Sequence, residues 1–342
     1  MIEFNETSIS KFAIHRISNE EENCSLNETI YETISEDEEE ILKRIFLKSF
    51  QTNTTTYEFK HEVDIELNTL LKLSKSINDR GNFLSKSKNI FQHLKAVSKH
   101  PNIKDGDLFI VKFEEIKMNN KFYDALGIYK IENKENFIET NSNNSGEIGL
   151  DFRKGIGNKR LDKASLIIFT EETFTVLVID NNSTETDYWQ NEFLKVGLRN
   201  DNVNNTTQFL TLAKNFVTQQ LSSEFEVTKA DQIDLLNRSV DYFKNHENFE
   251  KVEFENEVFQ DSEIIKSFRS FDSTYRQKND VDIADDFFIS SQAVKKQARV
   301  FKSVLKLDKN FDIYIHGNRE LIQQGVEKDG RKYYKIYFDQ ES

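Results

Sequence analysis

The stretch GDLFIVKFEEIKMNNKFYDALGIYKIE, residues 106–132, decides the fold. It consists of two apolar runs joined by a polar turn at residues 117–121, and large side chains alternate with a period of two along both runs. That alternation is typical of a β-hairpin. Both faces of the first run carry large apolar side chains, which indicates a central strand in a sheet covered on two sides.

A second hairpin is predicted at residues 161–180, where two apolar runs flank the polar turn 170–173. The two hairpins together supply at least four antiparallel strands. We therefore expect a central antiparallel sheet in the first part of the chain.

Four segments follow one another in an order that is similar to a known family. They are GDLFIVKF, the aromatic return run of the first hairpin, GIGNKRLDKASLIIF and LDKNFDIYIHG. In them the chain resembles the bacterial nucleoid-associated proteins of the NdpA/YejK type, over nearly its whole length. The resemblance implies a non-enzymatic protein that accompanies DNA in the cytoplasm, at the nucleoid, without a cofactor and without catalytic residues to transfer.

The composition indicates a folded, acidic chain. With 342 residues, two domains are the default expectation. Hydrophobic residues make up 37%, including 29 Phe, which is enough for packed cores. The net charge of −13 opposes diffuse attraction to nucleic acid, so a DNA-binding function needs a local basic patch.

The sequence also predicts a cytosolic location. The chain has one cysteine, Cys24, and its first residues lack the basic and then apolar pattern of a signal peptide. No apolar run approaches the roughly 18 residues that a membrane span requires.

The expected architecture is α+β, because helices and strands follow one another without regular βαβ alternation. In a first domain, residues 1–200, flanking helices are expected at 35–50, 67–77 and 83–99, short strands at 12–17, 28–34 and 54–59, and an exposed loop at 132–149. The clearest helix start is the capping box of Ser35 and Glu38.

The domain boundary is placed at residues 197–207, GLRNDNVNNTT, because this segment has few apolar side chains to bury. In the second domain, residues 201–342, helical periodicity predicts a helical layer. Strand pairs follow at 301–307 with 311–316 and at 321–326 with 333–338, which predicts an antiparallel β-meander.

The principal candidate for a binding site is the stretch DFRKGIGNKRLDK, residues 151–163, whose cations are Arg153, Lys154, Lys159, Arg160 and Lys163. Its local net charge is +3, and its two glycines would let the backbone approach phosphate oxygens. The alternative is a solvated inter-strand loop that offsets neighbouring acids. If the stretch contacts DNA, it should do so weakly and through phosphates, because it has no recognition helix.

A second basic set consists of Lys295, Arg299, Lys302 and Lys306. A helix continuing through Lys306 would place all four on one face, whereas the period-two pattern around Asp308 favours a hairpin that splits them.

The function alternatives differ in class. A nucleoid protein this acidic could act as an adaptor that contacts DNA-bound enzymes such as topoisomerases. The other class is a metal-dependent phosphoryl-transfer enzyme, a nuclease or phosphatase, that uses Asp280, Asp282, Asp285 and Asp286. That cluster lacks the glycine and distal glutamate of a calcium loop, and no phosphate-binding loop or catalytic motif occurs in the sequence.

Overall fold

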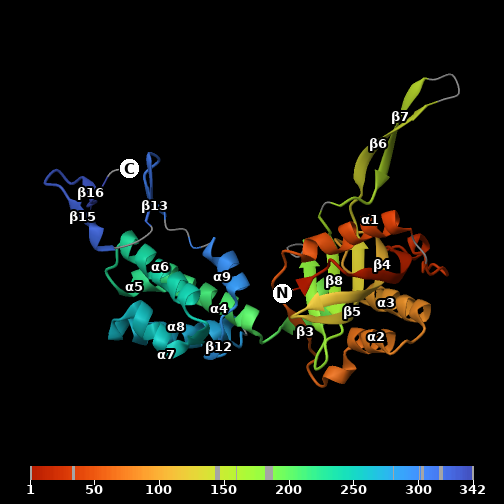
Figure 1. Ribbon diagram of the computed structural model, residues 1–342, viewed down its shortest axis with the longest axis horizontal. Helices are drawn as coiled ribbons and strands as arrows, with labels where there is room; N and C mark the ends of the chain where they lie inside the picture. The colour runs from red at the N-terminus through yellow and green to blue at the C-terminus, as the bar shows by residue number, and fades with distance from the viewer. Residues whose placement is uncertain are drawn as a thin grey trace. The chain divides into compact units, whose positions relative to one another are not determined.

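The hairpin expected at residues 106–132 lies in the middle of an eight-stranded antiparallel sheet (Figure 1). Its strands are β4 (Gly106–Met118) and β5 (Lys121–Ile131), and the second expected hairpin is formed by β8 (Lys163–Ile168) and β9 (Thr175–Asp180). Because β5 also pairs with β8, the two hairpins join into one sheet. Both hairpin predictions are confirmed.

Four further strands complete the sheet. They are β1 (Ile2–Glu3), β2 (Ser8–Ile17), β3 (Tyr57–Phe59) and β10 (Val196–Leu198). The order is β1-β4-β5-β8-β9-β3-β10, and β2 also pairs with β4. The computed structural model describes residues 2–32, 35–142, 147–158, 160–181, 188–279, 281–299, 301, 304–315 and 319–340.

Helices cover both faces of this sheet. Leu108 and Ile110 of β4 pack in one core with α2 (Thr69–Asn78) and α3 (Phe83–Val97). The alternate residues Phe109 and Val111 pack in another core with α1 (Glu36–Leu47). All four side chains are less than 10% exposed, so β4 is apolar on both faces because each face meets a helical layer.

The start of α1 shows the predicted capping box. The backbone N–H of Glu38 donates to Ser35 Oγ at 3.4 Å, and the backbone N–H of Ser35 donates to Glu38 Oε2 at 2.9 Å. The backbone N–H and the hydroxyl group of Ser35 both donate to the Glu38 carboxylate, which lowers the pKa of that group. Two otherwise unpaired N–H groups at the helix start are satisfied in this way.

Two expectations for the N-terminal part are wrong. Residues 28–34 form no strand within the described chain, where Tyr31 makes a single bridge to Phe12. Residues 132–149, expected as a loop, contain β6 (Glu135–Ser142), which pairs with β7 (Ile148–Gly155) in a separate two-stranded sheet. The polar composition of β6 hid its strand character, because neither strand of this hairpin is buried in a core.

The chain divides into two compact units, residues 1–199 and 200–342. The division falls inside the segment 197–207, but that segment is not a loose linker. Its first residues belong to β10, and from Asn202 it forms α4 (Asn202–Asn215). Asn205 and Thr206 are buried because their side chains accept hydrogen bonds from the backbone N–H groups of Ala284 and Ser290. The segment was expected to bury little because it has few apolar side chains, but in the structure it buries polar ones.

Limited proteolysis is expected to cut first at residues 199–201, which lie between β10 and α4, where Asn200 is exposed. Mass spectrometry of the first fragments checks this prediction. First cleavage within β8 or β9, with residues 199–201 left intact, would contradict the division into domains 1–200 and 201–342, which stays a prediction.

The second unit contains the predicted helical layer. Its helices and short strands are α4, α5 (Leu221–Glu224), α6 (Lys229–Asn245), β11 (Asn248–Glu250), α7 (Lys251–Phe254), α8 (Ser262–Asn279), β12 (Asp286–Phe288) and α9 (Ser291–Ala298). Phenylalanine dominates its core: Phe209 and Phe254, both fully buried, meet edge to face at 5.0 Å between ring centroids.

Two antiparallel hairpins follow, β13 (Val304–Leu307) with β14 (Phe311–Tyr314) and β15 (Ile322–Val326) with β16 (Lys332–Ile336). They are separate two-stranded sheets, and both contribute to a small core with Ile233 of α6. The α+β class predicted from the sequence is confirmed. Within the described part of the chain, no helix has the length and apolar character needed to cross a membrane.

Candidate nucleic-acid interface

The structure separates the four described cations of the stretch predicted at residues 151–163. Arg153 and Lys154 lie on β7, Arg160 follows that strand, and Lys163 begins β8. Lys159 lies outside the described residues. The stretch is therefore not one loop: Arg153 and Lys154 belong to the two-stranded sheet of β6 and β7, whereas Lys163 belongs to the eight-stranded sheet.

Lys163 is unable to meet a ligand at the surface, because its side chain is 2% exposed. Its Nζ lies 2.6 Å from Asp180 Oδ1 and 5.0 Å from the centroid of the Tyr188 ring. Lys130, also buried, donates to Glu132 Oε1 at 2.9 Å and to Tyr188 Oη at 3.2 Å, and burial lowers the pKa of its ammonium group. The two lysines thus form a buried polar cluster around Tyr188.

The cations on β7 are partly neutralised across the hairpin. Arg153 Nε lies 2.6 Å from Glu139 Oε2 on β6, and Arg153 Nη2 lies 3.8 Å from Asp151. Residues 135–155 contain two Lys or Arg residues against four Asp or Glu residues. Residues 151–163 alone have a net charge of +3. The whole hairpin that carries Arg153 and Lys154, however, has a net charge of −2.

The two glycines of this stretch do not leave the backbone open to phosphate. A Cβ at Gly155 would lie 2.6 Å from the ring of Phe137, and one at Gly157 would lie 2.6 Å from the carboxyl carbon of Glu135. Side chains of β6 already occupy the space above both glycines. Arg160 is exposed, and its guanidinium donates to Asn181 Oδ1.

The second basic set is split as the hairpin alternative predicts. Helix α9 ends at Ala298, so Lys295 and Arg299 lie at its C-terminal end, whereas Lys306 lies on β13. Lys302 is outside the described residues. Lys295, Arg299 and Lys306 consequently share no helix face.

These residues nevertheless belong to a longer basic segment that sequence motifs did not reveal. Residues 291–336 contain eleven Lys or Arg residues against five Asp or Glu residues, a net +6, so the remainder of the chain carries −19. Its exposed cations are Lys295, Lys296, Arg299, Lys306, Lys309, Lys328, Arg331, Lys332 and Lys335. A running sum of charge along the sequence would have found this C-terminal basic segment.

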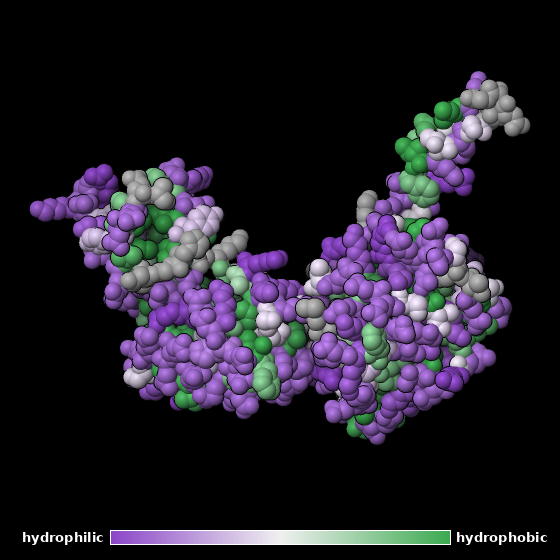
Figure 2. Space-filling model, viewed as in Figure 1, coloured by the Kyte–Doolittle hydropathy of each residue, from purple (hydrophilic) through white to green (hydrophobic). Residues whose placement is uncertain are grey.

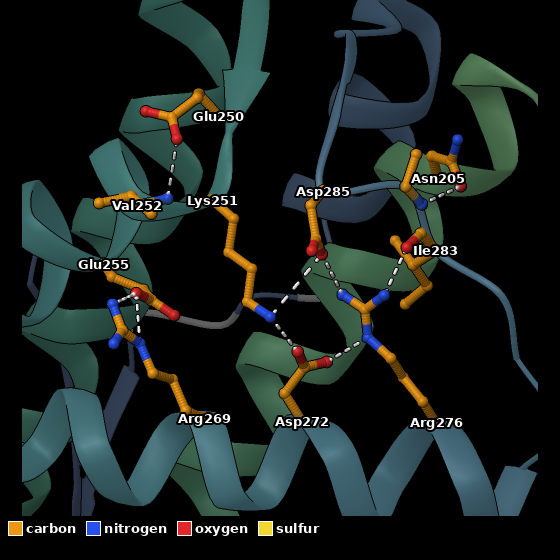
Figure 3. Close-up of polar contacts among 11 residues, drawn as sticks. Asn205, Glu250, Lys251, Val252, Glu255, Arg269, Asp272, Arg276, Ile283 and Asp285 are labelled. Atoms are coloured by element: carbon orange, nitrogen blue, oxygen red, sulfur yellow. Dashed lines mark hydrogen bonds and ion pairs between the residues drawn. The ribbon is translucent and has the colours of Figure 1, made fainter.

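Two members of the acidic cluster considered for metal binding have polar partners: Asp285 contacts cations (Figure 3), and Asp282 contacts an amide. Asp285 Oδ1 lies 2.9 Å from Arg276 Nη2 and 3.7 Å from Lys251 Nζ, and Asp282 accepts a hydrogen bond from Asn200 at 3.1 Å. Asp280 lies outside the described residues. Among the residues that the structure describes, no group of three or more His, Cys, Asp or Glu side chains could hold a metal ion.

An ion network in the second unit includes Asp285 of this cluster. Asp272 of α8, 2% exposed, accepts from Lys251 Nζ at 2.5 Å and from Arg276 Nε at 2.6 Å. Arg276 also donates to the carbonyl oxygen of Ile283 (Figure 3). Lys251, Asp272, Arg276 and Asp285 therefore tie α7, α8 and the segment before β12 together.

The β6–β7 hairpin is exposed and amphipathic. Direct cross-strand pairs place Ile138 with Phe152, and Leu150 and Ile148 belong to the same face. These four side chains are 57–79% exposed, and Figure 2 shows apolar side chains along this hairpin. The opposite face carries the Arg153–Glu139 ion pair. One face is thus apolar without a covering element in the described chain.

The comparisons with known proteins give one match. A family model with the description "Nucleoid-associated protein YejK" matches residues 13–333 of the 342. A search of curated proteins gave no match. The family match spans both compact units, including β6–β7 and most of the C-terminal basic segment.

Proposed function

Because the chain belongs to the nucleoid-associated protein YejK family, we propose that it is a non-enzymatic nucleoid protein that binds DNA weakly and directly through its C-terminal basic segment. The observation that supports this is the net +6 of residues 291–336 within a chain of −13. At physiological salt, charges are screened over about 8 Å, so this segment can act despite the distant acidic residues.

The exposed cations of the segment suit phosphate oxygens rather than base edges. Lys295, Lys296 and Arg299 lie on or next to the short helix α9, and the others lie on two short hairpins. Contacts to phosphates position a protein on DNA but carry no sequence information. Binding should therefore be independent of sequence and strongly salt-dependent.

Residues 151–163 remain the second candidate contact, through Arg153, Lys154, Lys159 and Arg160. The burial of Lys163 and the carboxylates around Arg153 favour the C-terminal segment. The two candidates can be separated because substitutions in one leave the other intact.

The test is fluorescence anisotropy of a labelled DNA duplex at several salt concentrations. A site that neutralises about three to five phosphates gives a log-log salt slope of roughly −3 to −4.5, with affinity no tighter than about micromolar at physiological salt. Lys295→Glu/Arg299→Glu should weaken binding by roughly tenfold or more and make the slope shallower. Lys154→Glu/Arg160→Glu, the matched charge reversal, should change neither quantity appreciably.

If Lys154→Glu/Arg160→Glu weakens DNA binding and Lys295→Glu/Arg299→Glu does not, the DNA contact lies at residues 151–163 instead. If the wild-type protein binds no duplex at low salt, direct DNA binding is wrong. Thermal melting of each variant, followed by circular dichroism, controls for folding, because exposed positions should change stability by less than about 0.5 kcal/mol.

The exposed apolar face of β6–β7 favours a second candidate function, that of an adaptor that reaches the nucleoid through a DNA-bound protein. An isolated two-stranded hairpin is at best marginally stable in water, and an apolar face on it is typical of a surface that a partner covers. The free edges of β6 and β7 also offer backbone groups to a partner strand. Topoisomerases are the partner class that the family resemblance suggests.

The adaptor function is tested with a purified bacterial topoisomerase and no DNA. Leu150→Ser/Phe152→Ser removes the apolar face and should abolish binding measured by calorimetry. Glu139→Ser/Arg153→Ser alters the opposite face of the same hairpin and should leave binding within about twofold, because exposed ion pairs contribute little. Equal loss in both variants, or no binding by the wild type, would contradict this candidate.

A further inference from the structure

The hairpin β15–β16 presents one face to a small core and the other to solvent. Pairing of Ile322 with Ile336 and of Gln324 with Tyr334 defines the first face, and Ile322 is 6% exposed against Ile233 of α6. The second face carries the partners of Gln323 and Gly325, which are Lys335 and Tyr333. Tyr337, just beyond β16, continues the same alternation.

The ring of Tyr333 lies flat against the neighbouring strand. A Cβ at Gly325 would clash with Cζ, Cε1 and the hydroxyl oxygen of Tyr333, so only glycine allows this side chain to cover the backbone at this position. One face of the ring therefore meets β15, while the side chain remains 42% exposed. A ring held in this way is a preformed surface on which a planar group can stack.

Tyr337 is held on the same side of the hairpin. Its hydroxyl donates to Gln323 Oε1 at 3.0 Å, and its backbone N–H donates to the carbonyl of Leu321 at 2.8 Å. The ring is 40% exposed, with Lys335 Nζ 4.7 Å from its centroid. Tyr333 and Tyr337 are four residues apart, about 13 Å along an extended chain, with Lys335 between them.

The charge around these rings is positive. Residues 322–339, which include both rings, contain Lys328, Arg331, Lys332 and Lys335 against Glu327, Asp329 and Asp339, a net +1. Covering Gly325 requires one aromatic ring and stabilises the hairpin. It does not require a second exposed tyrosine or the cations around the pair.

We propose that the face formed by Tyr333, Lys335 and Tyr337 binds single-stranded DNA by stacking unpaired bases on the two rings, with Lys335 on the intervening phosphate. Exposed aromatic side chains within a basic surface are the usual means by which proteins bind single strands, because every base offers a flat face. The proposal rests on the proposed function, since it uses cations of the same segment, but it adds a preference for unpaired bases.

The neighbouring hairpin β13–β14 offers a matched control. Phe311 and Tyr314 are 65% and 64% exposed, so their side chains are more accessible than the two tyrosines on β15–β16. Residues 304–314 have two Lys and two Asp residues and hence no net charge. Phe311 and Tyr314 therefore test exposed rings without a basic surface, whereas Tyr333 and Tyr337 test rings within one.

The experiment measures binding of the full chain to labelled oligothymidylate and, separately, to a labelled duplex by fluorescence anisotropy. Tyr333→Ala/Tyr337→Ala should weaken binding to oligothymidylate by about thirtyfold or more, since stacking contributes about 1–3 kcal/mol per base. The same variant should bind the duplex within about twofold of the wild type, because the phosphate-binding cations are unchanged. Tyr333→Phe/Tyr337→Phe keeps both rings and should retain binding to oligothymidylate, as should Phe311→Ala/Tyr314→Ala.

The outcomes separate this inference from the proposed function. Duplex binding without any oligothymidylate binding overturns the stacking proposal and leaves the proposed function in place, whereas binding to neither overturns both. Equal losses in the β13–β14 control, or in the phenylalanine variant, also overturn the proposal, because either result removes the specific role of the two rings. Melting curves followed by circular dichroism verify that the variants fold.

Discussion

Asp272→Ala is expected to lower the free energy of unfolding of the second unit by about 3 kcal/mol. The Asp272 side chain is 3% exposed, and its carboxylate contacts Lys251 at 2.5 Å and Arg276 at 2.6 Å. Removing one partner of a buried ion pair typically costs about 3–5 kcal/mol, because it leaves charge without compensation. We expect the lower end of that range, since Asp285 remains 2.9 Å from Arg276.

The matched control is Asp241→Ala on α6. Asp241 pairs with Lys244 at 3.1 Å, but both side chains are more than half exposed. Such pairs contribute about 0–1 kcal/mol. A comparable loss of stability in the two variants would show that the network around Asp272 has no special weight.

Urea unfolding can be followed separately in the two units. The chain has a single tryptophan, Trp189, which is fully buried in the first unit, whereas α6 and α8 belong to the second. Asp272→Ala should shift the transition seen by far-ultraviolet circular dichroism to lower urea and leave the tryptophan transition in place. A shift of both transitions together would mean that the units unfold as one.

The sequence predicted correctly those elements that are specified by residues close together in the chain. The capping box at Ser35 and the alternation in β4 and β5 specify structure through neighbouring residues, and both were confirmed. For these residues, the interactions that can be inferred from the sequence are the same interactions that stabilise the structure.

The candidate site was harder to predict because partners distant in sequence determine the state of each cation. In the sequence Lys163 has the pattern of an exposed charge. In the structure, pairing of β8 with β9 brings Asp180 within 2.6 Å of it. Arg153 reads as a phosphate ligand until β6 supplies Glu139. Polar side chains misled in the same way at Asn205 and Thr206, whose hydrogen-bond donors lie about 80 residues later.

The other large effect is expected from pH, through His15 of β2. His15 is 2% exposed, and burial, with a smaller contribution from the charge of Lys88, lowers its pKa from 6.5 to about 4, although Glu28 acts in the opposite direction. Its Nδ1 accepts a hydrogen bond from the backbone N–H of Asn27 at 3.2 Å, so the ring proton lies on Nε2.

The second ring nitrogen, Nε2, also has a hydrogen-bond partner. Nε2 lies 3.1 Å from Ser87 Oγ, and the Ser87 hydroxyl donates to the carbonyl of Leu84 at 2.9 Å. Nε2–H therefore donates to Ser87. A second proton on Nδ1 would break the bond from Asn27 and place a charge beside Phe91, whose ring centroid is 5.9 Å away. The folded protein consequently holds this histidine neutral.

Because the folded pKa lies below the unfolded one, the unfolded chain binds the proton first as pH falls. The contribution to stability is complete above about pH 6.5 and is lost progressively as pH falls toward 4. Between about pH 7.5 and about pH 5, the wild-type protein should lose about 2 kcal/mol of unfolding free energy through this group. Other groups that titrate in this range contribute equally to a variant that lacks His15.

His15→Gln removes the titrating group, so the difference in unfolding free energy between wild type and variant should shrink by about 2 kcal/mol between those pH values. Urea unfolding followed by Trp189 fluorescence measures it in the first unit, where both residues lie. His100→Gln removes an exposed imidazole and should leave the pH dependence of the wild type unchanged. A difference between wild type and His15→Gln that stays constant with pH would show that His15 is not held neutral by the fold.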